Sequence, residues 1–177
     1  MHLIQHALFY SLERGAQFVM LGAGSDRGIN DHFWHLKHYL NDNANVRMEI
    51  GFNEQLAHLI YASADIVIVP SLFEPCGRAQ MIAMRYGSVP VVRAVGGLID
   101  TVFDRDHSDQ PPETRNGYTF ENADFPGIES ALSRAIGLWF DYPGEFRRLM
   151  TSAMTADHSW AQSAERYLQV YESTRTK

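Results

Sequence analysis

The chain has 177 residues, of which 45% are hydrophobic and 20% are charged, a composition typical of a globular protein with a sizeable core. Its net charge of −6 at pH 7 argues against nucleic acid or an anionic membrane surface as a partner. One cysteine cannot form an internal disulfide, which favours a reducing compartment, and no apolar run approaches the ~18 residues of a membrane span.

Hydrophobic periodicity predicts alternating helices and strands along the chain. The predicted order is a helix at 1–15, a strand at 16–22, a helix at 31–42, a strand at 46–52, a helix at 53–64, a strand at 65–71, a helix at 79–87, a strand at 89–95, a short helix at 98–104, an exposed loop at 105–116, an edge strand at 117–121, and helices at 126–142, 144–156 and 159–174. This order predicts an α/β fold, a Rossmann-like parallel sheet flanked by helices on both faces. We expect one domain at 1–125, with a helical tail at 126–177 that packs on the same domain.

Ligands of open α/β sheets bind beyond the carboxyl ends of the strands. Four predicted loops lie there, at 22–26, 51–53, 71–80 and 94–98. Two of them lead into helix N-termini, whose free N–H groups suit a phosphate. Glycines in these two loops would let the backbone approach a ligand, although a double glycine equally serves a tight turn. The simplest ligand for this arrangement is a nucleotide diphosphate.

Loop 71–80 carries the residues with the most distinctive chemistry. Cys76 as a nucleophile would need a base, and no histidine lies within ten residues of it in the sequence, so a packed thiol is the favoured interpretation. Glu74 would either hydrogen-bond a sugar hydroxyl or cap the next helix.

The eight histidines do not predict a metal site. His32, His35 and His38 share one predicted helix, but the outer two lie ~120° apart around its axis and no carboxylate or cysteine cluster supports them. We therefore expect neither a metal nor a cofactor.

Residues 70–104, which read PSLFEPCGRAQMIAMRYGSVPVVRAVGGLIDTVFD, resemble a known family. The pattern is similar to P-S-x-F-E-P-C-G-L-T-Q and Y-G-x-x-P-x-V-R-x-T-G-G-L-x-D-T-V of bacterial glycogen synthases and plant-type starch synthases, with the starch synthase III branch nearest. These are retaining glycosyltransferases of the GT-B fold. The resemblance implies the carboxy-terminal half of such an enzyme, which transfers glucose from ADP-glucose or UDP-glucose to the non-reducing end of an α-1,4-glucan.

The resemblance also implies a role for each matching residue. Glu74 would bond the donor glucose hydroxyls and is the candidate catalytic residue. The implied substrate-binding residues are Phe52, Ser71, Cys76, Gly77, Arg78, Ala79, Gly96 and Gly97. Among these, Phe52 would stack on the nucleotide base, and the backbone N–H groups of Arg78 and Ala79 would meet the diphosphate.

Departures from the family pattern lead to the remaining expectations. Arg78-Ala79 replaces Leu-Thr, and Val95 replaces a threonine, so two hydroxyls near the donor are lost. Three features of the family would precede residue 1. These are the Arg and Lys that bind the diphosphate, the first strand of the sheet, and the amino-terminal half that binds the acceptor. We expect the chain alone to be inactive and located in the cytoplasm, or in the plastid stroma if it comes from a plant. The alternative is a non-catalytic module that binds glucan or a partner, or that forms a homodimer through an exposed sheet edge.

Overall fold

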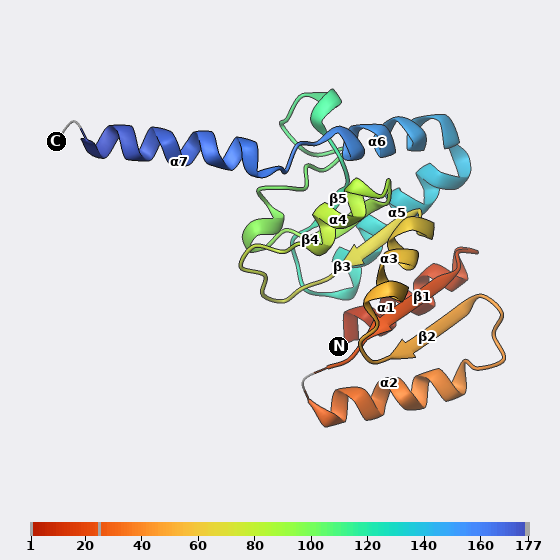
Figure 1. Cartoon of the computed structure of the whole chain (residues 1–177). Helices are drawn as coiled ribbons and strands as arrows, with labels where there is room; N and C mark the ends of the chain where they lie inside the picture. Colours follow the sequence, from red (N-terminus) through yellow and green to blue (C-terminus); the bar gives the residue numbers. More distant parts are fainter. Residues whose placement is uncertain (1, 25, 176–177) are drawn as a thin grey trace.

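Parallel strands alternate with helices in the computed structural model, which describes residues 2–24 and 26–175 (Figure 1). The helices are α1 (His2–Glu13), α2 (Arg27–Tyr39), α3 (Glu54–Ser63), α4 (Ala79–Arg85), α5 (Phe125–Asp141), α6 (Pro143–Thr155) and α7 (Trp160–Arg175). The strands are β1 (Phe18–Gly22), β2 (Val46–Ile50), β3 (Ile66–Val69), β4 (Val89–Arg93) and β5 (Tyr118–Phe120). Two short 3₁₀ turns are η1 (Gly96–Leu98) and η2 (Pro112–Thr114). This arrangement confirms the predicted α/β fold.

Side-chain caps explain where three of the helices begin. The Oδ1 atoms of Asp26, Asn53 and Asp124 each accept a hydrogen bond from a backbone N–H three residues later, at 2.8–3.1 Å. The cap at Asp26 starts α2 four residues before the predicted position, because it satisfies free N–H groups of the first turn. The helix predicted at 98–104 is wrong, since regular structure there is limited to the three-residue turn η1.

The parallel sheet is divided into two parts. β1 pairs with β2, from Phe18 opposite Val46 to Gly22 opposite Ile50, and β3, β4 and β5 form a second ladder in that order. Within the described residues no ladder joins β1 to β3, so one edge of each strand lacks a backbone partner. The sequence analysis predicted a single parallel sheet that lacks its first strand, whereas the structure has two separate ladders.

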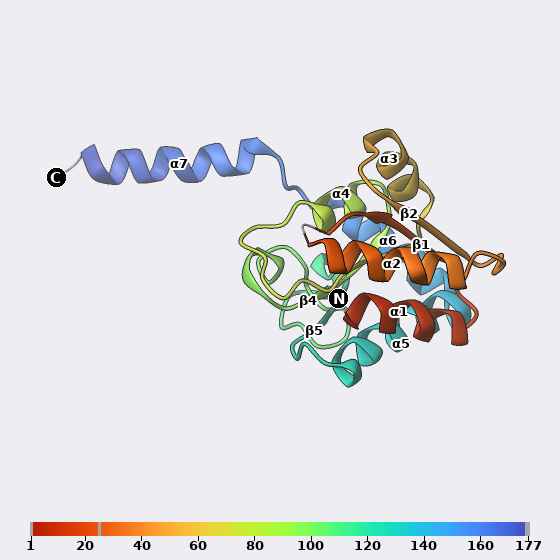
Figure 2. The same cartoon turned by 90° about the horizontal axis from the view of Figure 1, so that it is seen from below.

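The position of this break follows from the handedness of the connections. Leu8 of α1 packs in one core cluster with Phe33 and Leu36 of α2, so these two helices cover the same face, as Figure 2 shows. Crossovers between parallel strands are right-handed in ≈ 98% of cases. A strand that led into α1 would therefore pair with the edge of β1 that faces away from β2. This edge of β1 borders the break between the two parts of the sheet.

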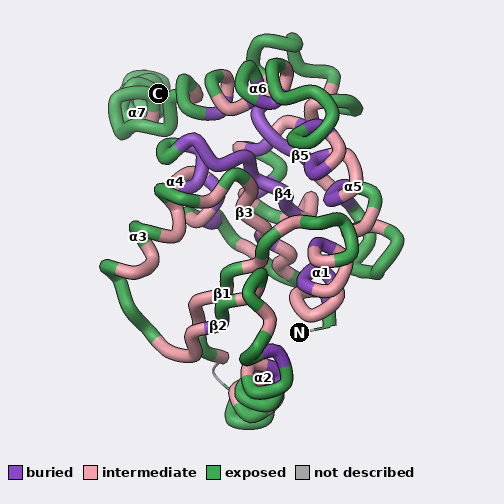
Figure 3. The backbone as a smooth tube through the Cα atoms, turned by 90° about the vertical axis from the view of Figure 1, so that its right-hand side faces the viewer, coloured by how far each residue is buried: buried purple, intermediate pink, exposed green. Residues whose placement is uncertain are grey.

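The main core lies between β4, β5 and the helix α5 (Figure 3). Val89, Val91 and Val92 of β4 are fully buried. The apolar run at 65–71 predicted such burial for β3 instead, where Val69 is buried and the other three residues are half-buried. Leu3 and Ala7 of α1 belong to the same cluster. Helix α1 therefore links the main core to the cluster beneath β1 and β2.

The helical tail divides into a packed part and a projecting part. Helices α5 and α6 contact the strands and each other, whereas α7 has no buried residue and extends away from the body (Figures 1 and 2). The expectation that the whole tail packs on the domain is thus not met by α7, and the boundary at residue 125 stays a prediction. None of the described helices is long and apolar enough to cross a membrane.

Candidate functional site

The loops after β3 and β4 pack directly on each other. The Gly97 N–H donates to the carbonyl oxygen of Glu74 at 3.2 Å. A Cβ on Gly96 would overlap that same carbonyl, and a Cβ on Gly97 would lie 2.5 Å from the Cα of Cys76. Gly96 also has φ +52°, a conformation that favours glycine. The close contact between the two loops therefore accounts for the double glycine.

Two polar side chains that sequence reasoning missed connect these loops from beneath. Gln80 is fully buried, and its Nε2 donates to the carbonyl of Gly77 and to Oγ1 of Thr101, both at 3.1 Å. The Thr101 hydroxyl in turn donates to the carbonyl of Gly97 at 3.0 Å. An amide within the apolar run of helix α4 is the sequence signal that could have identified Gln80.

The Glu74 carboxylate is partly buried and turns toward its own loop. Its Oε2 accepts a hydrogen bond from the hydroxyl of Ser71 at 3.1 Å. Helix α4 begins after Arg78 without a side-chain cap, so Glu74 does not cap it. Of the two roles that the sequence left open, capping is excluded by this geometry.

Arg93 at the end of β4 supports the outer part of loop 71–80. Its Nη1 donates to the carbonyl of Leu72 at 2.9 Å, and its Nε donates to the carbonyl of Glu121 at 3.0 Å. The side chains of Leu72 and Phe73 are left exposed at the surface. Sequence reasoning passed over Arg93 because a strand-end arginine is ordinarily a solvated residue.

The remaining residues of the loop lie at its surface or at the start of α4. Cys76 is exposed, so the expectation of a close-packed thiol is wrong: its backbone packs against Gly97 while its side chain remains accessible. Gly77 is buried with φ +69°, Arg78 is exposed, and Ala79 is the first residue of α4. Among the described residues no group of three His, Cys, Asp or Glu side chains could hold a metal ion.

The first two predicted loops lie together at the ends of β1 and β2. The Gly51 N–H donates to the carbonyl of Gly22 at 3.0 Å, and φ of +148° at Gly51 turns the chain toward α3. Phe52 then presents an aromatic ring that is 92% exposed. Ser25 of loop 22–26 lies outside the described residues. In Figure 1 the strands β2 and β3 point the same way, so the loops that follow them, 51–53 and 71–80, lie at the same end of the molecule.

Comparison with known proteins identifies the family of the chain. A family model for glycosyl transferases of group 1 matches residues 2–137. The chain belongs to this family. Glycogen synthase 1 of Trichormus variabilis is 52% identical over 99% of the chain, and glycogen synthase 2 of Methylococcus capsulatus is 54% identical over 99%. The chain spans 36% of the length of each relative, within the carboxy-terminal part.

Solved structures of glycosyltransferases support the same assignment. The catalytic domain of starch synthase IV from Arabidopsis thaliana, bound to ADP and acarbose, is 41% identical, with a TM-score of 0.93 over 99% of this chain and 36% of its own. Anabaena HepE in complex with UDP and glucose matches over 100% of this chain and 45% of its own, with a TM-score of 0.63 at 18% identity, a likeness of fold alone. The resemblance to glycogen and starch synthases is thus confirmed, while the starch synthase III branch stays a prediction.

Proposed function

We propose that this chain is the nucleotide-sugar-binding part of an α-1,4-glucan synthase, which transfers glucose from ADP-glucose to the non-reducing end of a glucan. The observation that carries the proposal is the likeness over 99% of the chain to a starch synthase structure bound to ADP. UDP-glucose is the second candidate donor, since an exposed phenylalanine stacks on either base.

The two connected loops would hold the donor in this proposal. Glu74 would bond the glucose hydroxyls, with Ser71 orienting its carboxylate through their 3.1 Å hydrogen bond. The backbone at Gly77, Arg78 and Ala79 would face the diphosphate. Gln80, which is fully buried, and Thr101 would act as positioning residues, because their hydrogen bonds fix the carbonyls of both loops.

We further propose that the 177-residue chain has no transferase activity by itself. Retaining transfer requires donor and acceptor to be held together in a closed cleft, and the chain spans 36% of the length of its relatives. The glucan acceptor would be bound mainly by an amino-terminal part. The cytoplasm remains our proposed location.

Calorimetric titration of the purified chain with ADP and with UDP tests the donor site. We expect ADP to bind, and Phe52→Ala to weaken binding at least about fivefold, because stacking of a base on an aromatic ring contributes about 1–3 kcal/mol. Tyr39→Ala is the matched control, since Tyr39 is 79% exposed at the far end of α2. Absence of binding of both nucleotides at millimolar concentration would refute the proposal.

A second candidate function is supported by the divided sheet. The unpaired edges of β1 and β3 favour a non-catalytic module that associates through backbone pairing, with a homodimer as the simplest case. Sedimentation velocity over a hundredfold range of concentration separates the two candidates. Concentration-dependent association without nucleotide binding would favour the module.

A further inference from the structure

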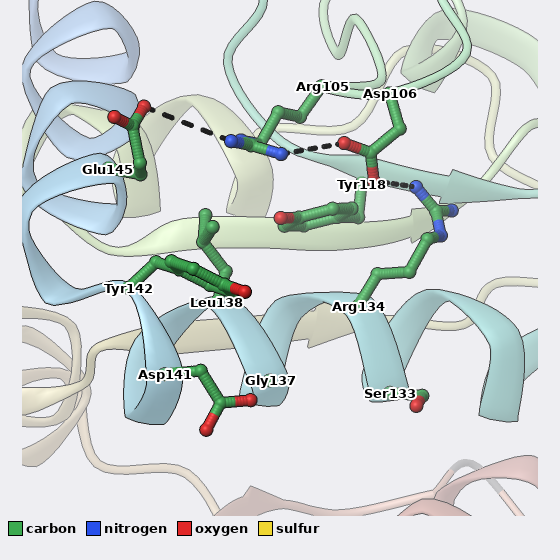
Figure 4. A pocket seen from close by; sticks show the side chains of 10 residues that line it. All are labelled: Arg105, Asp106, Tyr118, Ser133, Arg134, Gly137, Leu138, Asp141, Tyr142 and Glu145. Carbon is green, nitrogen blue, oxygen red and sulfur yellow. Dashed lines mark hydrogen bonds and ion pairs between the residues drawn. The ribbon is translucent and has the colours of Figure 1, made fainter.

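A separate cavity lies where β5, α5 and α6 meet (Figure 4). It measures about 550 Å³ and is lined by β5, by the segment 105–106, by the second half of α5 and by the start of α6. Tyr118, which lines it, is the first residue of β5, whereas the donor loops follow the carboxyl ends of the strands. The cavity therefore shares no residue with the donor site.

A network of ion pairs forms one wall of the cavity. Arg134 of α5 contacts both carboxylate oxygens of Asp104, at 2.7 and 3.1 Å, and Asp106 at 3.0 Å. Arg105 donates to Asp106 at 2.8 Å and lies 3.9 Å from Glu145 of α6. These groups are fixed in place and offer donors and acceptors side by side, with their charges largely compensated.

Tyr118 contributes its phenol group to the lining of the cavity. The residue is 1% exposed. Burial, reinforced by the nearby Asp106 carboxylate, raises the pKa of Tyr118 to about 12, so the hydroxyl stays neutral. Leaving a buried polar group unpaired is costly, and the Nε of Arg134 is buried without a hydrogen-bond partner among the described residues.

Gly137 leaves the floor of the cavity open. It lies within α5, where glycine is less favourable than alanine. A Cβ at this position would meet only Oδ2 of Asp141, at 3.9 Å, so no packing contact requires a glycine. A larger residue at this position would instead add side-chain atoms to the lining of the cavity.

The lining groups select a neutral ligand with many hydroxyls. The carboxylates of Asp106, Asp141 and Glu145 line the cavity and disfavour an anionic ligand. No group of His, Cys, Asp or Glu side chains that could hold a metal ion is found in the part of the chain that the structure describes. A sugar hydroxyl can accept from a guanidinium and donate to an adjacent carboxylate at the same time. The apolar face of a sugar ring can pack against an exposed tyrosine ring such as that of Tyr142.

We propose that this cavity is a second carbohydrate site, which holds a short segment of α-glucan. The ligand class follows from the cavity, while the choice of an α-glucan rests on the proposed function. Because a glucan is a long polymer, one branch would remain in this site while another reaches the donor loops. Tethering of this kind raises the effective concentration of chain ends near the donor.

Native gel electrophoresis in gels that contain glycogen, with calorimetric titration of maltoheptaose, tests the proposal on the full chain. We expect glycogen to retard the wild-type chain. Tyr142→Ala, which removes the exposed ring, and Gly137→Leu, which fills the floor, should each raise the apparent dissociation constant at least fivefold. Tyr39→Ala is the matched exposed control and should behave as wild type. Gly137→Leu should unfold at or above the wild-type temperature, which confirms that its helix is intact.

The same titrations separate this site from the donor site. ADP affinity should be unchanged in Tyr142→Ala and Gly137→Leu. Retention of glycogen binding by a chain that does not bind ADP would leave the second site standing and refute only the proposed function. The proposal is overturned if the wild-type chain is not retarded, if both variants are retarded as strongly as wild type, or if Phe52→Ala rather than Tyr142→Ala abolishes retardation.

Discussion

Replacement of Asp104 by asparagine tests how far one buried ion pair supports the edge of the sheet. Asp104 is 4% exposed and bonds Arg134 through both carboxylate oxygens. Oδ1 also accepts from the N–H groups of Asp106 and His107, and Oδ2 accepts from that of Thr119 at 2.6 Å. All these partners are donors. Asp104→Asn turns one acceptor oxygen into an NH₂ group that faces donors, and it leaves Arg134 with only the exposed Asp106 carboxylate as a charge partner.

The expected loss of stability follows from these contacts. Breaking one side of a buried pair costs about 3–5 kcal/mol, because the remaining charge stays in a poorly solvated site. A domain of this kind has about 5–15 kcal/mol in total. Asp106→Asn is the matched control, since Asp106 pairs with the same Arg134 but lies at the surface, where a pair contributes about 0–1 kcal/mol.

Urea unfolding at pH 7, followed by circular dichroism, measures both variants. We expect Asp104→Asn to lower the free energy of unfolding by about 3–5 kcal/mol, and Asp106→Asn to lower it by less than about 1 kcal/mol. The reasoning is refuted if Asp104→Asn lies within about 1 kcal/mol of wild type, or if the two variants lose equal amounts.

The other predictions concern pH, the glycine contact and the buried amide. Burial alone would raise the pKa of Asp104, but the hydrogen bonds from Arg134 and from backbone N–H groups outweigh burial and lower this pKa. The ionised carboxylate therefore stabilises the fold fully above the pKa of the unfolded state, near 3.9, and this stabilisation is lost as the pH falls through the lower pKa of the folded state. The wild-type advantage over Asp104→Asn in urea unfolding should therefore shrink below about pH 4. Gly97→Ala should lower the free energy of unfolding by about 1–3 kcal/mol and weaken ADP binding, because the added Cβ pushes the two loops apart. Gly22→Ala is the control and should leave ADP binding unchanged, since no atom lies within 4 Å of the added Cβ. Gln80→Met should lower the free energy of unfolding by about 1–3 kcal/mol and weaken ADP binding, since the carbonyl of Gly77 loses its hydrogen-bond donor. Unchanged ADP affinity would show that the loops hold their shape without Gln80.

The sequence was sufficient for the features that depend on local pattern. The apolar run at 65–71 predicted a strand of a parallel sheet, and β3 is one, although only Val69 in it is buried. Parallel strands place their carboxyl ends at one edge, so the meeting of the loops that contain Glu74 and Gly97 followed. The resemblance to glycogen synthases depended on the same stretch.

Features that depend on distant partners could not be predicted. Arg134 and Asp104 are 30 positions apart and pair only because α5 returns along β5. The accessibility of Cys76 depends on how Gly97 approaches its backbone, which composition does not reveal. Helix 98–104 was predicted from apolar spacing, but the hydroxyl of Thr101 bonds the carbonyl of Gly97 and belongs to the loop.

The divided sheet has a consequence for how the molecule opens. The half that contains β1 and β2 is held to the rest by side-chain packing of α1 and by the covalent connection through α3, without a backbone ladder to β3. Interfaces of this kind separate at lower free energy than continuous ladders. We expect the amides of β1 and β2 to exchange hydrogen together and faster than those of β4. The break would thus divide one domain into two cooperative units, and a strand that joined β1 to β3 would merge them into one.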